Sequence, residues 1–187
     1  YEQLGRPIAE YFAGHSLGEV GALAAAGAID DADGVRIVVA RGQAMDDAAR
    51  RGEPGGMLAV GTDWDGAAAL ADEHDLTLAN ENSPQQFVLS GALVAIEAAE
   101  AAAKDAGIRA KKLAVAGAFH TDAMASGVRP FRAALEEIEF REPEVPVVSS
   151  ASAELFGDDA ADSLAASLTS PIRWTAVLAR LRDLGVA

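Results

Sequence analysis

The segment over residues 14–18 constrains the fold most, because a serine stands between two glycines in a Gly-x-Ser-x-Gly pattern. The apolar run over residues 8–13 predicts a buried strand, and the Gly-, Ala- and Leu-rich stretch that ends at Ala26 predicts a helix. In such a strand–turn–helix the serine has a strained backbone and an exposed hydroxyl, and glycines two residues away remove β-carbons that would clash. The first helical turn directs N–H groups at an oxyanion. The pattern predicts that Ser16 is a nucleophile.

The same serine also permits a purely structural interpretation, as the N-cap of the following helix. Ser16 and Glu19 have the spacing of a capping box, in which a hydroxyl and a carboxylate bond reciprocally to backbone N–H groups. The sequence leaves both interpretations open, and they differ in what the two side chains contact.

Composition narrows the class of protein. Half of the 187 residues are hydrophobic, which is enough for a sizeable core and argues against disorder. The absence of cysteine excludes disulfides, thiolate chemistry and cysteine-based zinc sites, and the three histidines show no metal-ligand spacing. No stretch has the pattern of a membrane span or a signal peptide, so we expect a cytoplasmic protein without a membrane partner.

The formal net charge of −14 argues against a nucleic-acid partner, because the phosphate backbone would be repelled. The basic residues that the chain does have include two local clusters. They predict either a solvated face or a small docking patch for an acidic partner. The clusters consist of Arg109, Lys111 and Lys112, and of Arg129 and Arg132.

A long helix is predicted from Asp30 and Asp31 to about Arg51. Its apolar residues recur at helical spacing, and Arg41 falls on the same stripe, which we expect to face the core. A buried guanidinium needs an anionic partner, either a distant acidic residue or the carboxylate of a ligand. The stripe consists of Val35, Val38, Val39 and Met45.

A break rich in glycine over residues 52–56 precedes a new pattern. The elements predicted after it have the order β-α-β-β-α-β, the ferredoxin-like order, which indicates a small subdomain inserted into a larger α/β layer. Its predicted strands are 57–60, 76–80, 87–90 and 111–115, and its helices are 64–74 and 92–106. Beyond it we predict helices over 122–138 and 159–168, a strand over 145–150 and a last helix opened by residues 170–174.

Five short motifs follow one another along the chain. They are Gly14-His15-Ser16-Leu17-Gly18-Glu19, Arg41-Gly42 with Met45, Asn82-Ser83-Pro84, Ala118-Phe119-His120, and Pro171-Ile172-Arg173-Trp174. Together with the inserted subdomain they resemble the malonyl-CoA:acyl carrier protein transacylases and the related acyltransferase domains of polyketide and fatty-acid synthases. The resemblance covers nearly the whole chain.

The resemblance implies a role for each of five residues. Ser16 would be the nucleophile and His120 its general base, titrating near neutrality as an ordinary imidazole does. Arg41 would bind the free carboxylate of a malonyl group, which suits a planar two-pronged donor. The N–H of Leu17 would supply half of the oxyanion hole. Phe119 stands where malonate-selective members carry phenylalanine and methylmalonate-selective members carry serine.

The resemblance also implies an α/β fold. Residues 1–53 and 117–187 would form a parallel-sheet, hydrolase-like core, and the ferredoxin-like subdomain would be inserted at residues 54–116. Family members have a strand with a Gly-Gln-Gly-type loop before the elbow and a Gly-Pro-Gly-like loop after the last helix. This sequence has neither, so the chain is expected to be an internal fragment with an incomplete core.

The implied activity moves a malonyl group from malonyl-CoA to the pantetheine thiol of acyl carrier protein, through an acyl-serine and without a metal or other cofactor. A serine esterase of the α/β-hydrolase type is an alternative, but it requires an acid between its serine and histidine and has no such insertion. We expect Asp122 to be an ordinary residue of a helix N-terminus, and not a third catalytic member. A second alternative is a truncated, non-catalytic acyltransferase piece.

Overall fold

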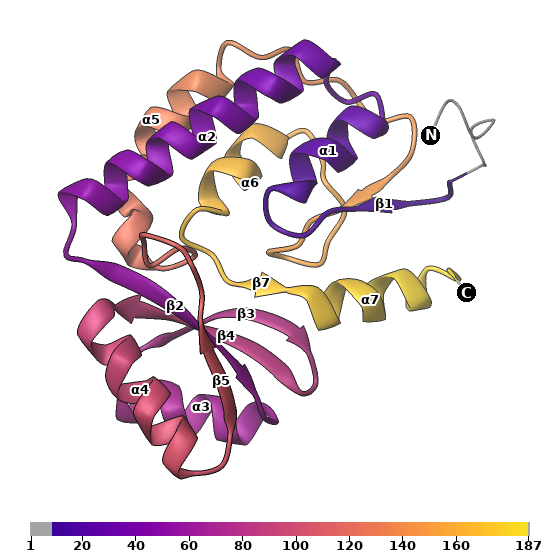
Figure 1. The fold of residues 1–187 in the computed structure, drawn as a ribbon. Coiled ribbons are helices and arrows are strands. Elements are labelled where there is room, and N and C mark those ends of the chain that lie inside the picture. Colours follow the sequence, from indigo (N-terminus) through magenta and orange to yellow (C-terminus); the bar gives the residue numbers. More distant parts are fainter. Residues whose placement is uncertain (1–8, 187) are drawn as a thin grey trace.

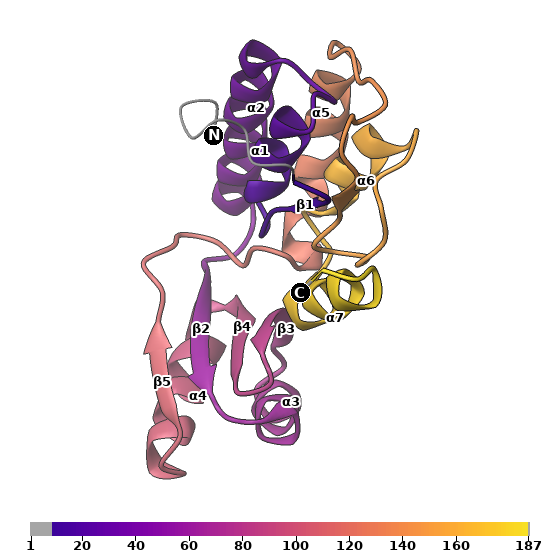
Figure 2. The same ribbon diagram turned by 90° about the vertical axis from the view of Figure 1, so that its right-hand side faces the viewer.

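The computed structural model describes residues 9–186, which form two parts, each with its own sheet (Figure 1 and Figure 2). The first part contains β1 (Phe12–Ala13), α1 (Gly18–Ala25), α2 (Asp31–Arg51), the 3-10 helix η2 (Asp122–Met124), α5 (Ala125–Leu135), β6 (Val147–Val148) and α6 (Ala160–Ala166). The second part contains β2 (Gly55–Gly61), α3 (Trp64–Glu73), β3 (Thr77–Ser83), β4 (Gln86–Ala92), α4 (Leu93–Asp105) and β5 (Arg109–Lys112). The chain ends with β7 (Ile172–Arg173) and α7 (Trp174–Asp183), and α7 lies between the two parts.

The order of the elements in the second part is β-α-β-β-α-β, as the sequence pattern predicts. Its sheet has the strand order β5-β2-β4-β3-β7, and the first four strands pair antiparallel. The fifth strand, β7, pairs parallel to β3, with Ile172 opposite Asn80. The sequence does not predict β7, because two residues are too short to show an alternating pattern. The sheet of the second part therefore includes a strand from the C-terminal region.

Side chains alternate between the two faces of this sheet. Leu58 and Leu89 pack against α3 and α4 in one hydrophobic cluster. Their neighbours Met57 and Val88 belong to another cluster, which includes Phe119 from the segment after β5. Because successive strand residues point to opposite faces, one face of the sheet carries its helices and the other faces the first part.

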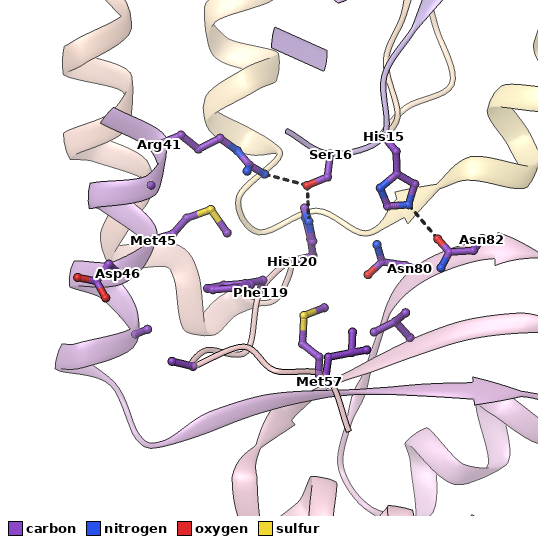
Figure 3. Close-up of a pocket in the computed structure, with 15 residues that line it drawn as sticks. His15, Ser16, Arg41, Met45, Asp46, Met57, Asn80, Asn82, Phe119 and His120 are labelled. Atoms are coloured by element: carbon purple, nitrogen blue, oxygen red, sulfur yellow. Dashed lines mark hydrogen bonds between the residues drawn. The ribbon is translucent and has the colours of Figure 1, made fainter. Parts of the chain in front are cut away.

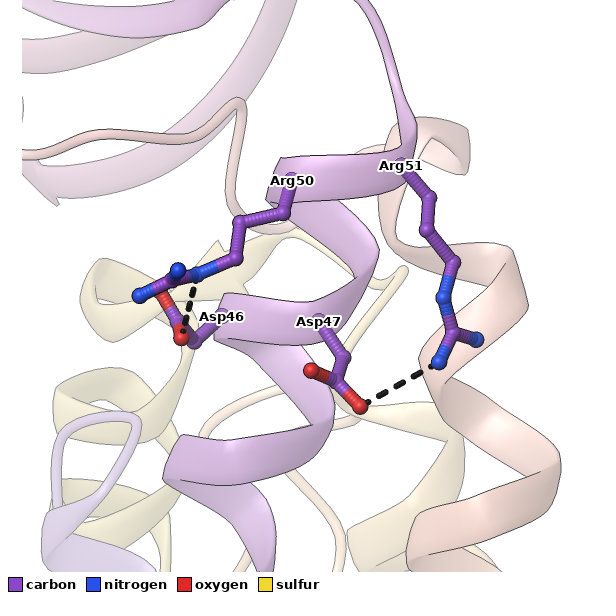
Figure 4. Close-up of polar contacts among 4 residues, drawn as sticks. All are labelled: Asp46, Asp47, Arg50 and Arg51. Carbon is purple, nitrogen blue, oxygen red and sulfur yellow. Dashed lines mark hydrogen bonds and ion pairs between the residues drawn. The ribbon is translucent and has the colours of Figure 1, made fainter.

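The helix α2 begins and ends at residues that suit these positions. The Asp30 side chain accepts the N–H of Asp33 at 2.7 Å, as an N-cap does. In the last turns, Arg50 pairs with Asp46 at 2.8 Å and Arg51 with Asp47 at 3.3 Å (Figure 4). All four side chains are exposed, so each pair contributes only about 0.3–0.5 kcal/mol to the helix. No helix among residues 9–186 combines the length and the apolarity that a membrane span needs.

The buried face of α2 is not the predicted stripe. Val35, Val38 and Val39 are exposed, with relative accessibilities of 64%, 38% and 51%, so the prediction is wrong for the valines. It is correct for the arginine and the methionine. The helix turns its small side chains toward α5, because the contact is close: a Cβ on Gly127 would lie 2.8 Å from the carbonyl oxygen of Ala44. The buried apolar face with its arginine consists of Ile37, Arg41, Ala44, Met45 and Ala48.

Other elements lie where the sequence predicts them but are shorter. The helix predicted over residues 122–138 divides into η2 and α5, and the Thr121 hydroxyl caps η2 by accepting the N–H of Ala123 at 3.2 Å. Of the strand predicted over residues 8–13, residue 8 lies outside the described residues, and only β1 forms. The strand predicted over residues 145–150 is reduced to β6, which pairs parallel to β1.

Candidate active site

Ser16 lies in the turn between β1 and α1, and its backbone has a φ of +52°. Residues other than glycine rarely adopt this left-handed backbone conformation. A Cβ on Gly14 would lie 2.0 Å from the carbonyl carbon of Gly18, so the turn requires glycine at position 14. A Cβ on Gly18 would meet nothing within 4 Å, so the predicted need for glycine is wrong there. The strained strand–turn–helix is otherwise as predicted.

The capping-box interpretation is wrong. Leu17 occupies the N-cap position of α1, and no side chain caps the helix. The Ser16 hydroxyl points toward the space between the two parts (Figure 3), and the Glu19 carboxylate accepts hydrogen bonds from the loop after β6. Both side chains are engaged by residues far away in the sequence.

Ser16 and His120 form a hydrogen-bonded pair, with 2.9 Å between Oγ and Nε2. The other ring nitrogen, Nδ1, lies 3.0 Å from the carbonyl oxygen of Ser167 and 3.1 Å from that of Ser170. Carbonyl oxygens only accept, so Nδ1 carries the proton and Nε2 of the neutral ring accepts the serine proton. These carbonyls take the place that an acid has in a triad, in agreement with the expectation that Asp122 is no third member.

His120 is buried, at 4% relative accessibility. Burial, with a smaller effect of the Arg41 charge, lowers the pKa of His120 to about 4, although the two carbonyl contacts oppose this. The prediction of an imidazole that titrates near neutrality is therefore wrong. The ring is neutral at pH 7, which is the state that accepts a proton.

Arg41 reaches the same point from α2. It is 6% accessible, and one of its terminal nitrogens donates to Ser16 Oγ at 3.0 Å (Figure 3). Burial lowers the pKa of Arg41, and the negative charge of Glu19 opposes this effect. The Ser16 hydroxyl thus accepts a hydrogen bond from a cation and donates one to an imidazole.

A cavity of about 510 Å³ opens beside these three side chains (Figure 3). The floor of the cavity is formed by Met57 and Val88, on the helix-free face of the sheet in the second part. The partly buried ring of Phe119 also lines it, next to His120, and the Phe119 carbonyl accepts the Ser90 hydroxyl at 2.9 Å. The lining residues are His15, Ser16, Arg41, Gly42, Met45, Asp46, Ala49, Met57, Asn80, Asn82, Val88, Leu113, Ala116, Phe119 and His120.

Polar side chains from β3 line another side of the cavity. His15 Nε2 donates to Asn82 Oδ1 at 2.8 Å, and the His15 ring packs against Trp174 with 5.4 Å between the ring centres. Asn80 also lines the cavity, although the sequence does not predict it as a site residue, and its buried Oδ1 has no hydrogen-bond partner among residues 9–186. A single asparagine within a short strand pattern is a weak signal, because only the strand register directs it into the cavity.

Leu17, the predicted oxyanion-hole residue, is not among the residues that line the cavity. Its side chain is exposed, at 43%, while its N–H lies at the start of α1 directly after Ser16. Within the described part of the chain, that N–H donates no hydrogen bond. An unbonded N–H at a helix N-terminus suits an oxyanion.

The two basic clusters lie on different parts of the molecule, one on β5 and the other on α5 (Figure 1). Each has a paired member: Lys112 contacts Glu97 at 3.1 Å, and Arg132 contacts Asp162 at 2.7 Å. They do not form one continuous patch. No group of acidic residues and histidines between residues 9 and 186 is arranged to hold a metal ion.

The amino-acid sequence of the chain matches a known protein family. The acyl transferase domain family matches residues 4–184, and the chain belongs to it. A malonyl CoA-acyl carrier protein transacylase of Synechocystis is 38% identical over 181 residues, which cover 94% of this chain and 59% of the relative. The polyketide biosynthesis protein PksE of Bacillus subtilis is 38% identical over 182 residues, covering 93% of this chain and 23% of the relative.

The fold is also similar to that of solved members of the same family. The crystal structure of an acyl-carrier-protein S-malonyltransferase from Burkholderia pseudomallei superposes with a TM-score of 0.92 at 33% identity, covering 99% of this chain and 62% of that one. The predicted family resemblance is confirmed. The chain spans about three-fifths of the length of the transacylase relative.

Proposed function

We propose that the protein transfers a malonyl group from malonyl-CoA to the pantetheine thiol of acyl carrier protein, in fatty-acid or polyketide synthesis, through an acyl-serine. One observation carries this proposal: Ser16 Oγ lies within hydrogen-bonding distance of both His120 Nε2 and the Arg41 guanidinium. The first contact suits an activated nucleophile, and the second suits an acyl group with a free carboxylate.

In the first half-reaction, His120 Nε2 takes the proton of Ser16 as Oγ attacks the thioester carbonyl. The Leu17 N–H stabilises the oxyanion, and His120 returns the proton to the departing CoA sulfur. In the second, His120 deprotonates the pantetheine thiol, whose sulfur attacks the acyl-serine, and then returns the proton to Ser16 Oγ. The neutral ring and its Nδ1 contacts support both steps.

Arg41 selects the acyl group in this proposal. In a malonyl-serine the free carboxylate carbon is three bonds from Oγ, so a guanidinium that already contacts Oγ is close to it. Asp46, at the cavity wall, is paired with Arg50, which lowers its repulsion of an anionic substrate. The Phe119 ring would occupy the room that an α-methyl branch needs.

The proposal requires neither a metal nor a redox cofactor, and we expect the reaction to take place in the cytoplasm.

The proposed enzyme is divided into a hydrolase-like core, residues 1–53 and 117–187, and a ferredoxin-like insertion, residues 54–116. The strand order β5-β2-β4-β3 supports the ferredoxin-like description. The cavity lies between the two proposed units, whose side chains both line it.

Incubation of the full-length protein with radiolabelled malonyl-CoA, followed by addition of acyl carrier protein, tests the proposal. We expect label on Ser16 that then moves to the carrier protein. Label released mainly to water would favour the serine esterase. Absence of label on Ser16 would favour a non-catalytic acyltransferase piece.

A further inference from the structure

Glu19 carries a buried carboxylate that the proposed chemistry does not use. It lies in the first turn of α1, three residues after Ser16, and is 1% accessible. One of its oxygens accepts the Ser150 N–H at 2.6 Å and the Ser149 hydroxyl at 3.1 Å. Burial raises the pKa of Glu19, and these hydrogen bonds and the Arg41 charge oppose that effect. A buried carboxylate is costly without such partners.

Ser150 connects this carboxylate with the nucleophile. Its own Oγ accepts the Ser16 N–H at 3.2 Å, and its carbonyl accepts the Arg173 N–H at 2.7 Å. Ser150 is fully buried and follows β6, whereas Ser16 follows β1, the parallel neighbour of β6. The elbow and the loop after β6 are therefore joined at the same end of this two-stranded sheet.

The backbone of Ser16 needs such support, because a φ of +52° is maintained only where the surroundings enforce it. A hydrogen bond to a carboxylate is roughly twice as strong as one between neutral groups. Glu19 thus anchors Ser150 more firmly than a neutral acceptor would. Its negative charge also favours the ionised state of the neighbouring Arg41.

We propose that Glu19 is a positioning residue for the nucleophile: through Ser150 it fixes the Ser16 backbone and so keeps the hydroxyl in line with His120. The inference rests on the proposed function in one respect, since it takes Ser16 to be the nucleophile. It concerns the placement of Ser16 and not the identity of the acyl group.

The test uses an uncharged fluorophosphonate, which reports on Ser16 and His120 without needing malonyl-CoA. Ser16 Oγ forms a P–O bond, fluoride leaves, and the serine proton passes to His120. In the full-length protein we expect Glu19→Ala to slow this labelling on the order of 100-fold, because small displacements of a reacting atom have effects of that size. Glu19→Gln keeps a weaker, neutral acceptor for Ser150 and should recover part of the rate.

Combining substitutions separates positioning from general destabilisation. Because Glu19 acts through Ser150, the double variant Glu19→Ala with Ser150→Ala should label no more slowly than the slower single variant. Asp33→Asn is the matched control, since it neutralises a buried acid of α2 that pairs with Arg36, and it should label at the wild-type rate. Circular dichroism establishes that each variant is folded.

Wild-type labelling by folded Glu19→Ala, or losses that add in the double variant, would overturn the proposal. If Glu19→Ala does not fold, Ser150→Ala decides: slow labelling supports the positioning role, and wild-type labelling overturns it. A wild-type protein that shows the expected labelling pattern but accepts no malonyl group would contradict the proposed function and support the role of Glu19.

Discussion

The buried His120 makes the stability of the folded protein depend on pH. Its pKa is about 4, because burial and the Arg41 charge oppose protonation, whereas a histidine in an unfolded chain has a pKa of about 6.5. Between these values the unfolded chain binds a proton that the folded chain does not, so the free energy of unfolding falls as the pH falls through this range. The gap between the two pKa values corresponds to about 3 kcal/mol, of which about 2 kcal/mol is lost between about pH 7 and about pH 5.

Carboxylates also titrate in this range, so the informative comparison is with a His120→Gln variant, which has no titrating side chain at that position. Urea denaturation at a series of pH values gives the free energy of unfolding of both proteins. We expect the wild type to lose about 2 kcal/mol more than the variant between about pH 7 and about pH 5. Equal losses in the two proteins would refute the reasoning, because they would mean that the fold does not hold His120 neutral.

Five further substitutions, of which Gly18→Ala is a control, test the proposed site. Ser16→Ala should leave the free energy of unfolding nearly unchanged and abolish the malonyl adduct seen by mass spectrometry; an adduct on the variant would remove Ser16 as nucleophile. Arg41→Ala should lower kcat/KM for malonyl-CoA at least about 100-fold while acetyl-CoA is tolerated, because two charge-assisted hydrogen bonds contribute roughly 1.5–3 kcal/mol each. Equal use of both thioesters by the wild type would contradict this role. Gly14→Ala should prevent labelling of Ser16, whereas Gly18→Ala, with open space around its Cβ, should label normally; similar behaviour of the two would show that the turn does not need Gly14. Phe119→Ser should raise the ratio of methylmalonyl to malonyl transfer, and an unchanged ratio in a competition assay would argue against a steric role.

Several parts of the site are predictable from short stretches of sequence. The Gly-x-Ser-x-Gly pattern with a strand before it and a helix after it depends on neighbouring residues, so the strained turn at Ser16 could be foreseen. The same holds for the N-cap Asp30 and for the period-2 and period-3.6 patterns that predict the β-α-β-β-α-β order. These features depend on backbone sterics and local hydrogen bonds, which the sequence contains directly.

Contacts between distant segments decided the rest. The valines of α2 are as apolar as its buried residues, and the close approach of Gly127 to the Ala44 backbone selected which face packs. Nothing near His120 in the sequence indicates that carbonyls at Ser167 and Ser170 would orient its ring, or that burial would lower its pKa.

Glu19 shows most clearly how a contact predicted from local sequence differs from the contact made in the folded chain. Its spacing from Ser16 predicts a local cap, yet the Ser150 N–H, on the neighbouring strand end, binds its carboxylate at 2.6 Å. The sequence by itself determined the candidate residues for the proposed chemistry and the local turn that exposes the Ser16 hydroxyl. The tertiary structure decided their partners and the ionisation of His120, because burial and charge at a site depend on every segment packed around it.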